Sequence, residues 1–157
     1  MKIALVTRIF AIALLLFAAA VFEAEAQTVT GSIGKGTVER GKAARGTIVL
    51  SIPDGLHVNS NRPASEYAIP TSVRLSARGV KIVGPTYPRG KNRKFQFSDN
   101  AINVYEDRVT FPFTLNVPAN FRGNFVRVNA TVRYQACTDE VCYPPRNRQV
   151  TLTARVM

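Results

Sequence analysis

The sequence predicts an all-β protein that folds as a single immunoglobulin-like β-sandwich. Three observations predict this fold class. Apolar and polar residues alternate in short stretches, residues typical of turns separate these stretches, and no segment has a sustained 3.6-residue apolar period. About seven short strands with turns at this spacing are typical of two sheets packed face to face.

The expected strands of the first half are short and bounded by turn residues. Residues 46–52 form the first and end at Pro53-Asp54-Gly55, a strong turn signal. Residues 72–77 alternate between apolar and polar side chains, which predicts a second strand. A third covers residues 80–83 and stops at Gly84-Pro85.

The second half of the chain has the clearest strand patterns. Residues 109–117 are strand-like, but Pro112 cannot donate to a ladder, so we expect an edge or a bulge there. Residues 125–136 and 149–156 alternate throughout. The side chains expected to face the core are those of Val126, Val128, Ala130, Val132, Tyr134, Val150, Leu152, Ala154 and Val156.

Three other stretches lack such patterns. Residues 31–46 hold several glycines and many small residues, which predicts a loose strand or arm. Residues 57–70 and 85–104 are expected to be long loops. Loops of that length in a compact domain are often functional.

Residues 1–26 have the features of a signal peptide. Lys2 and Arg8 accompany an apolar run, and Ala24-Glu25-Ala26 fits a small-x-small cleavage site. The alternative is a retained membrane anchor, but the apolar run is shorter than the roughly 20 residues of a spanning helix. We therefore expect one mature domain, residues 27–157, exported to the periplasm, with no transmembrane segment of its own.

The chain is strongly basic, with a formal net charge of +11. Export argues against a nucleic-acid partner, and the basic residues are scattered along strands and loops rather than gathered on one helix. Residues 89–94 are the one dense basic cluster. Two interpretations remain open for it: a solvated loop, or a docking patch for an acidic partner or an anionic membrane surface.

The two cysteines, Cys137 and Cys142, flank a hairpin connection between the last two expected strands. A disulfide that closes a loop of about six residues contributes roughly 2 kcal/mol in the chain-entropy model, whereas a loop of 100 would contribute nearly 5. A short, exposed disulfide is also accessible to thiol attack. Both a redox-active dithiol and a static disulfide therefore remain open from the residues alone.

A metal site is a weaker alternative. The two cysteines and His57 leave a zinc centre one ligand short unless a carboxylate joins them, and the spacing resembles no zinc ribbon. We expect neither a metal nor another cofactor.

The charges around the cysteines have opposite effects on a thiol. Asp139 and Glu140, inside the loop, would raise the pKa of either thiol, whereas Arg133, Arg146 and Arg148 would lower it. These opposing charges do not identify the attacking cysteine.

The cysteine hairpin resembles the active-site hairpin of the N-terminal periplasmic domain of the thiol–disulfide interchange protein DsbD family. The specific motif is Tyr134-Gln135-Ala136-Cys137 followed by Cys142-Tyr143-Pro144-Pro145. The likeness covers most of residues 46–156. Supporting motifs lie at residues 55–63, 67–71 and 105–112.

This resemblance implies an immunoglobulin-like fold in which Cys137 and Cys142 are the redox couple. Domains of the family take electrons from a membrane-embedded thiol reductase. They pass them to periplasmic thioredoxin-like proteins, such as a disulfide isomerase or a cytochrome c maturation factor. The chain would then be a component of a protein-disulfide reductase and would need no cofactor.

The family also shields its cysteines with an aromatic cap loop, and the candidates here are Phe95 and Phe97; ordinary core packing is the alternative for both. His57 is expected near the cysteines, where it would tune them, although a lone histidine is more often structural. Further tuning residues are Asp139, Glu140 and Tyr143. The loop at residues 138–141 is one residue shorter than in some members.

The full family protein also has a transmembrane electron-transfer domain and a thioredoxin-like domain. The present sequence contains neither, so we expect its electron-transfer partners on separate chains. The function from another class that competes with this one is a non-catalytic binding or assembly module, in which the disulfide is inert.

Overall fold

A computed structural model describes residues 27–157, which form twelve strands and no helix. The expected signal peptide lies outside these residues. Strands in which apolar residues, many of them β-branched, alternate with polar ones suit a half-buried pleated surface. Such strands form two large four-stranded sheets here. The first has the order β1 (Thr28–Ile33), β3 (Ala43–Ser51), β9 (Arg108–Asn116), β6 (Lys81–Val83).

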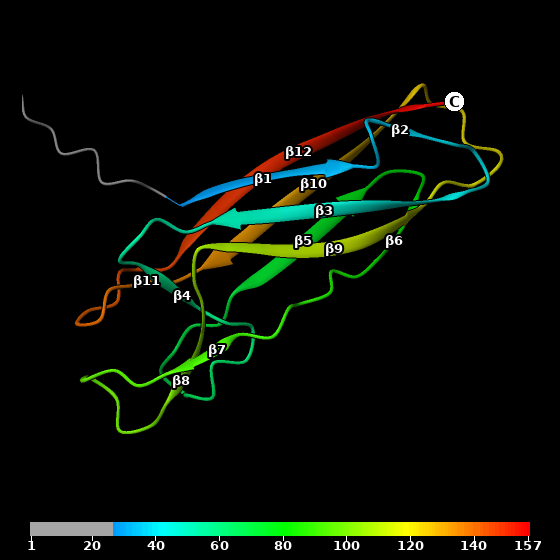
Figure 1. The fold of residues 1–157 in the computed structure, drawn as a ribbon. Coiled ribbons are helices and arrows are strands. Elements are labelled where there is room, and N and C mark those ends of the chain that lie inside the picture. Colours follow the sequence, from blue (N-terminus) through cyan, green and yellow to red (C-terminus); the bar gives the residue numbers. More distant parts are fainter. Residues whose placement is uncertain (1–26) are drawn as a thin grey trace, which may run out of the picture.

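The second large sheet carries the two longest strands, and Figure 1 shows it lying against the first as a second layer. Its order is β2 (Thr37–Val38), β12 (Arg146–Val156), β10 (Phe125–Tyr134), β5 (Ser72–Ala77). Among its pairs, β2 with β12 is parallel and the others are antiparallel. Buried and exposed residues alternate along β10, as predicted.

The core lies between the two large sheets. Both contribute to one cluster of buried side chains, which the all-β sandwich predicted from the sequence requires. The largest fully buried members are Tyr134, Phe111, Ile33, Ile48, Leu50 and Leu115. Of the side chains expected to face inward, Val150 is only partly buried, because it packs at the margin of this cluster.

A third, small sheet lies at the end of the sandwich that carries the cysteine hairpin (Figure 1). Its order is β11 (Ala136–Cys137), β4 (His57–Asn59), β8 (Ile102–Tyr105), β7 (Lys91–Arg93). The prediction of long loops at residues 57–70 and 85–104 is therefore wrong in part, since both stretches contain strand residues. Strands of two to four residues are too short for a period of two to be recognised.

The N-terminal segment is part of the sandwich, so the expected loose arm is wrong. All six residues of β1 pair with β3, and β2 pairs with the end of β12. Ile33 and Val38 are buried in the core. Glycine supplies turns between strands here: Gly34 and Gly36 have φ values of +50° and +87°, where other residues are strained.

Pro112 lies in an interior strand rather than an edge strand, contrary to expectation. The pairing of β9 with β3 runs through Pro112 without an inserted residue, so there is no bulge either. The neighbouring strand β6 pairs only as far as Thr114. The Pro112 carbonyl accepts a hydrogen bond of 2.8 Å from the backbone N–H of Thr86, so this side of Pro112 faces a connection and needs no ladder donor.

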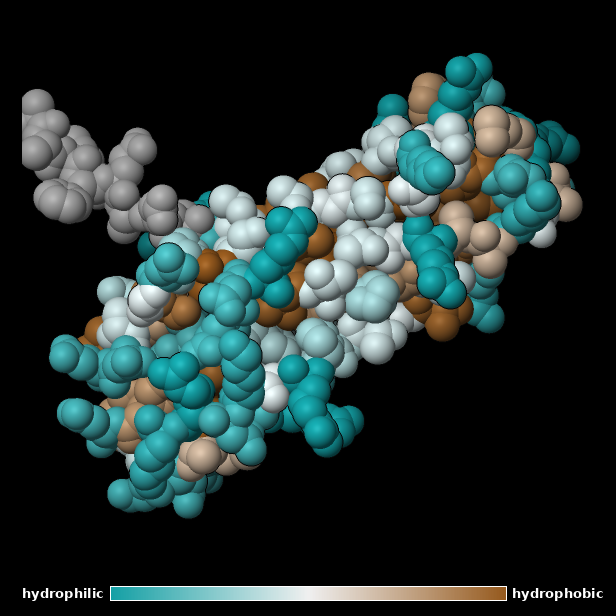
Figure 2. All heavy atoms as spheres, in the orientation of Figure 1, coloured by the Kyte–Doolittle hydropathy of each residue, from teal (hydrophilic) through white to brown (hydrophobic). Residues whose placement is uncertain are grey.

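The surface separates by chemistry along the molecule. In Figure 2 hydrophilic residues gather over the end that carries β7 and β8, whereas the middle of the visible face is paler. Within residues 27–157 there is no helix long and apolar enough to cross a membrane.

Candidate functional site

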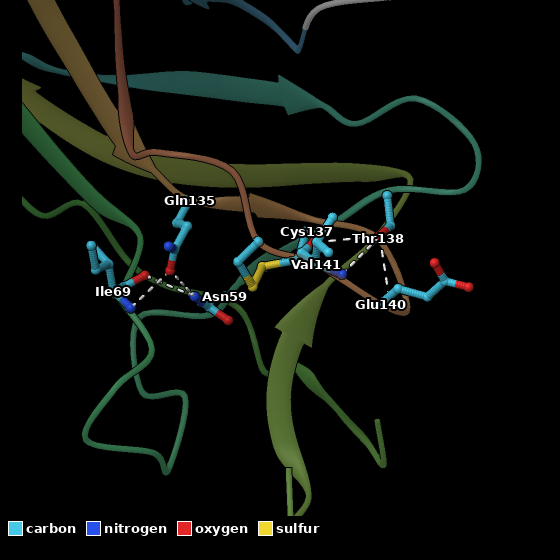
Figure 3. Close-up of a disulfide and its surroundings, with 8 residues drawn as sticks. Asn59, Ile69, Gln135, Cys137, Thr138, Glu140 and Val141 are labelled. Atoms are coloured by element: carbon cyan, nitrogen blue, oxygen red, sulfur yellow. Dashed lines mark hydrogen bonds between the residues drawn. A yellow bond between two sulfur atoms is a disulfide. The ribbon is translucent and has the colours of Figure 1, made fainter. Parts of the chain in front are cut away.

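The two cysteines are joined by a disulfide across the start of the β11–β12 connection (Figure 3). Their sulfur atoms are 2.06 Å apart and their Cα atoms 4.0 Å apart. The Thr138 N–H donates to the Val141 carbonyl and the Tyr143 N–H to the Ala136 carbonyl, each over 2.8 Å. These two bonds flank the cysteines, which makes Cys137 and Cys142 a close, non-hydrogen-bonded pair of an antiparallel ladder.

The loop between the cysteines is ordered by Thr138, which the sequence analysis did not single out. Its Oγ1 accepts hydrogen bonds from the backbone N–H of Glu140, at 3.2 Å, and of Val141, at 3.1 Å (Figure 3). A threonine at the first position of a turn commonly satisfies the following backbone donors. That preference was the available sequence signal.

The two cysteines differ in exposure to solvent. Cys137 lies within β11 and is 0 % exposed. Cys142 lies beyond the turn and is exposed. Only one of the two cysteines is therefore exposed, an asymmetry that spacing alone cannot predict.

His57 lies next to the disulfide, as expected. It is the direct partner of Cys137 in the pairing of β4 with β11. Its ring stacks on Phe95, with centroids 4.3 Å apart, and Phe95 stacks on Phe97 at 5.2 Å. His57 of β4, Cys137 of β11 and the two cap candidates are thus brought together at one place.

The two candidate cap residues differ in environment. Phe95 is buried in a second, small core cluster with Ile102 and Val104, whereas Phe97 is 44 % exposed. The aromatic stack therefore covers the β4 side of the site, and Cys142 remains exposed.

Burial lowers the pKa of His57 below its usual 6.5. The charges of Asp139 and Glu106 oppose this effect, and that of Arg93 adds to it. Asp139 is thus electrostatically coupled to His57. The two other tuning candidates, Glu140 and Tyr143, are exposed on the hairpin.

A second feature missed by the sequence analysis is the amide pair Asn59 and Gln135. Asn59 is 2 % exposed, and Gln135 stands between β10 and β11. The side-chain amide of Asn59 donates a hydrogen bond of 3.0 Å to Oε1 of Gln135. The same oxygen accepts a second hydrogen bond, of 3.2 Å, from the backbone N–H of Ile69 (Figure 3). Asn59 ends a strand of three residues and Gln135 stands between two strands, so neither carries a periodic signal that identifies its partner.

The basic cluster at residues 89–94 is partly neutralised within the chain. Glu106, whose side chain is 17 % exposed, pairs with Lys91 at 3.1 Å and with Arg93 at 2.6 Å. Arg89 is exposed and has no ion-pair partner among residues 27–157. The segment is the strand β7 with its flanks rather than a free loop.

Within the part of the chain that the structure describes, no three His, Cys, Asp or Glu side chains gather in a way that could hold a metal ion.

The arginines near the cysteines differ in exposure. Arg133 and Arg146 are exposed, whereas Nε of Arg148 is buried without a hydrogen-bond partner.

Comparison with known proteins gives one family. The model of the family described as "Thiol:disulfide interchange protein DsbD, N-terminal" matches residues 26–154. No curated protein matches the chain.

Among solved structures, the chain is similar to the N-terminal periplasmic domain of ScsB from Proteus mirabilis, at 12 % identity and a TM-score of 0.55. The match covers 85 % of this chain and 48 % of that one, so the chain spans about half the length of the ScsB domain. Spo0M from Bacillus subtilis matches at 14 % identity and a TM-score of 0.33, over 82 % and 49 % of the two chains. That score is too low to carry an argument.

Proposed function

The chain belongs to the family of the N-terminal domain of the thiol:disulfide interchange protein DsbD, and from this premise we propose that Cys137 and Cys142 are its redox couple. Family membership makes it a thiol–disulfide interchange domain and confirms the predicted immunoglobulin-like β-sandwich. The observation that carries the proposal is a disulfide between one exposed and one buried cysteine at the end of the sandwich that carries the small sheet.

The unequal exposure assigns different roles to the two sulfurs. A partner can approach Cys142, because it is exposed, but not Cys137, which is 0 % exposed. Thiol–disulfide exchange requires access of one sulfur to another through a mixed disulfide. Cys142 is therefore the residue that forms the mixed disulfide with a partner, and Cys137 is the residue that resolves it.

The exchange balances without a cofactor. The Cys142 thiolate attacks one sulfur of the partner's disulfide, and the partner's other sulfur leaves as a thiolate. Cys137 then attacks Cys142, the bond between Cys142 and the partner breaks, and the partner's second thiolate is released. Two electrons have moved from the cysteine pair to the partner, and the Cys137–Cys142 disulfide is restored.

We propose the direction of electron flow and the partners by analogy with the family. The domain, residues 27–157, would work in the periplasm after export, receive its electrons from a membrane-embedded thiol reductase and reduce thioredoxin-like proteins there. Around the hairpin, Phe95 and Phe97 would limit oxidation of the cysteines from the β4 side, since Phe95 stacks on His57, which pairs with Cys137. The exposed side chains of Glu140 and Tyr143 would meet the partner.

The reduction potential of the Cys137–Cys142 pair tests the proposal. The purified domain is equilibrated in glutathione buffers, and its free thiols are counted. A redox carrier should have a potential of about −120 to −270 mV. A value well below roughly −300 mV would instead indicate a structural disulfide and favour a binding or assembly module.

Single-cysteine variants test the two roles. With a purified, oxidised periplasmic disulfide isomerase as the probe, Cys137→Ser should accumulate a mixed disulfide through Cys142. The matched variant Cys142→Ser leaves only the buried thiol and should accumulate at least tenfold less. The assignment of roles is wrong if the two variants trap the isomerase equally.

A further inference from the structure

His57, Cys137 and Cys142 form a row across three adjacent segments of backbone. Cys137 pairs with His57 on one side and with Cys142 on the other. Residues directly opposite each other in a ladder project their side chains from the same face, with Cβ atoms about 4.5–5.5 Å apart. His57 and Cys137 therefore project their side chains from the same face, and His57 stands on the side of Cys137 away from Cys142.

The His57 ring has an unsatisfied nitrogen. The side chain is 4 % exposed, and its Nε2 is buried with no hydrogen-bond partner. A buried polar atom without a partner costs about 1–3 kcal/mol, so native structures rarely leave one unexplained. Stacking on Phe95 fixes the plane of the ring without using either nitrogen.

The surroundings of His57 favour the neutral ring. Burial lowers its pKa, and the facing charges are those of Asp139, Glu106 and Arg93. Asp139 stands in the cysteine loop, Glu106 follows β8 and Arg93 ends β7, while the flanking element β11 adds only the disulfide itself. A neutral imidazole can accept a proton, and the two carboxylates stabilise the cation that results.

We propose that His57 is the base that accepts the Cys137 proton in the resolving step. This inference rests on the proposed function and adds a proton path to it. Once Cys142 is joined to the partner, the Cys137 thiol gives its proton to Nε2 of His57. The Cys137 sulfur attacks Cys142, the partner leaves as a thiolate, and that thiolate or solvent takes the proton from His57. Without such a base, the resolving step depends on the small fraction of Cys137 that is thiolate at neutral pH.

A single-turnover reaction separates the two chemical steps. The reduced domain is mixed with a chromogenic aryl disulfide, which releases one coloured thiolate when Cys142 attacks and a second when Cys137 resolves. In the variant His57→Phe, which keeps an aromatic ring against Phe95, the first phase should stay within twofold of wild type. The second phase should slow about 10²-fold at pH 7, the lower end of the usual effect of a general base.

The pH profile distinguishes a base from a packing residue. Without His57, the second phase should rise about tenfold per pH unit, in proportion to the thiolate formed by hydroxide. With His57, the second phase should stay nearly flat until the imidazole is protonated. The control Ile102→Val loosens the cluster around Phe95 without removing an ionisable group, and it should keep the wild-type profile. If His57→Phe folds poorly, His57→Gln provides the same comparison.

The outcomes separate this inference from the function beneath it. A missing first phase would count against exchange at Cys142 itself. A normal first phase, with a second phase of wild-type rate and pH profile in both His57 variants, would exclude His57 as the base and leave the redox couple in place.

Discussion

The side-chain amide of Asn59 donates a hydrogen bond of 3.0 Å to Oε1 of Gln135, which lies 76 residues further along the chain. The bond connects β4 to the link between β10 and β11, just before the buried cysteine. The same Asn59 Nδ2 also lies 3.2 Å from the Ile69 carbonyl. The strand β4, the loop that follows it and the start of the cysteine hairpin are thus held together by one pair of amides.

Removing this acceptor should destabilise the domain. In Gln135→Ala, the buried Asn59 amide and the Ile69 N–H both lose a partner, so we expect the free energy of unfolding to fall by about 1–3 kcal/mol. Urea unfolding of the oxidised protein measures this. The exposed Gln149→Ala is the matched control and should change stability by less than about 0.5 kcal/mol. Equal losses in both variants would contradict the role of the amide pair.

The disulfide should contribute only modestly to the free energy of unfolding. It joins residues only five apart in sequence, and the chain-entropy model gives about 2 kcal/mol for a loop this short. The double variant Cys137→Ala, Cys142→Ala should therefore lose roughly this amount in thermal or urea unfolding. A loss of about 5 kcal/mol would instead identify a structural staple.

Gly46 is required by the packing of Phe113. The two residues face each other between β3 and β9, and a Cβ at Gly46 would overlap the Phe113 ring, which is 4 % exposed. Gly46→Ala should cost about 1–3 kcal/mol through overpacking. In a Phe113→Leu background the same substitution should cost clearly less, because the ring is gone. Equal costs in the two backgrounds would exclude the contact as the cause.

The stability of the oxidised domain should depend on pH through His57. Its pKa is lowered in the fold, so the unfolded chain binds the proton first as the pH falls below about 6.5. The free energy of unfolding should therefore decrease from neutral pH until the folded-state pKa is reached. His57→Phe lacks this component, so the stability difference between wild type and variant should change in favour of the variant on acidification. A constant difference between pH 7.5 and pH 5 would refute the effect.

The basic cluster allows a test of electrostatic docking. If it meets an acidic partner, exchange rates should fall with salt. Arg89 is unpaired within residues 27–157, whereas Lys91 is bound to Glu106, so Arg89→Gln should reduce the salt dependence more than Lys91→Gln does. Rates that do not change with salt in the wild type would remove the docking role altogether.

The large sheets could be predicted because their strands are long enough to repeat. All ten residues of β10 alternate between solvent and core, as do residues 149–156 of β12, and a period of two over that length is a clear signal. Pro112 shows the limit of such rules. The sequence shows that Pro112 lacks a backbone donor, but not that β6 stops pairing at Thr114, before it reaches Pro112. Because β6 stops there, Pro112 can lie in an interior strand.

The sequence by itself determined the fold class and the faces of the long strands, since both depend on local periodicity. The tertiary structure alone decided that Cys137 is buried and Cys142 exposed, that His57 lies opposite Cys137, and that Asn59 meets Gln135. These relations join β4 to β11 over some eighty residues of chain, and strands of two and three residues carry no pattern that identifies their partner. Only the closing of the small sheet against the end of the sandwich fixes them.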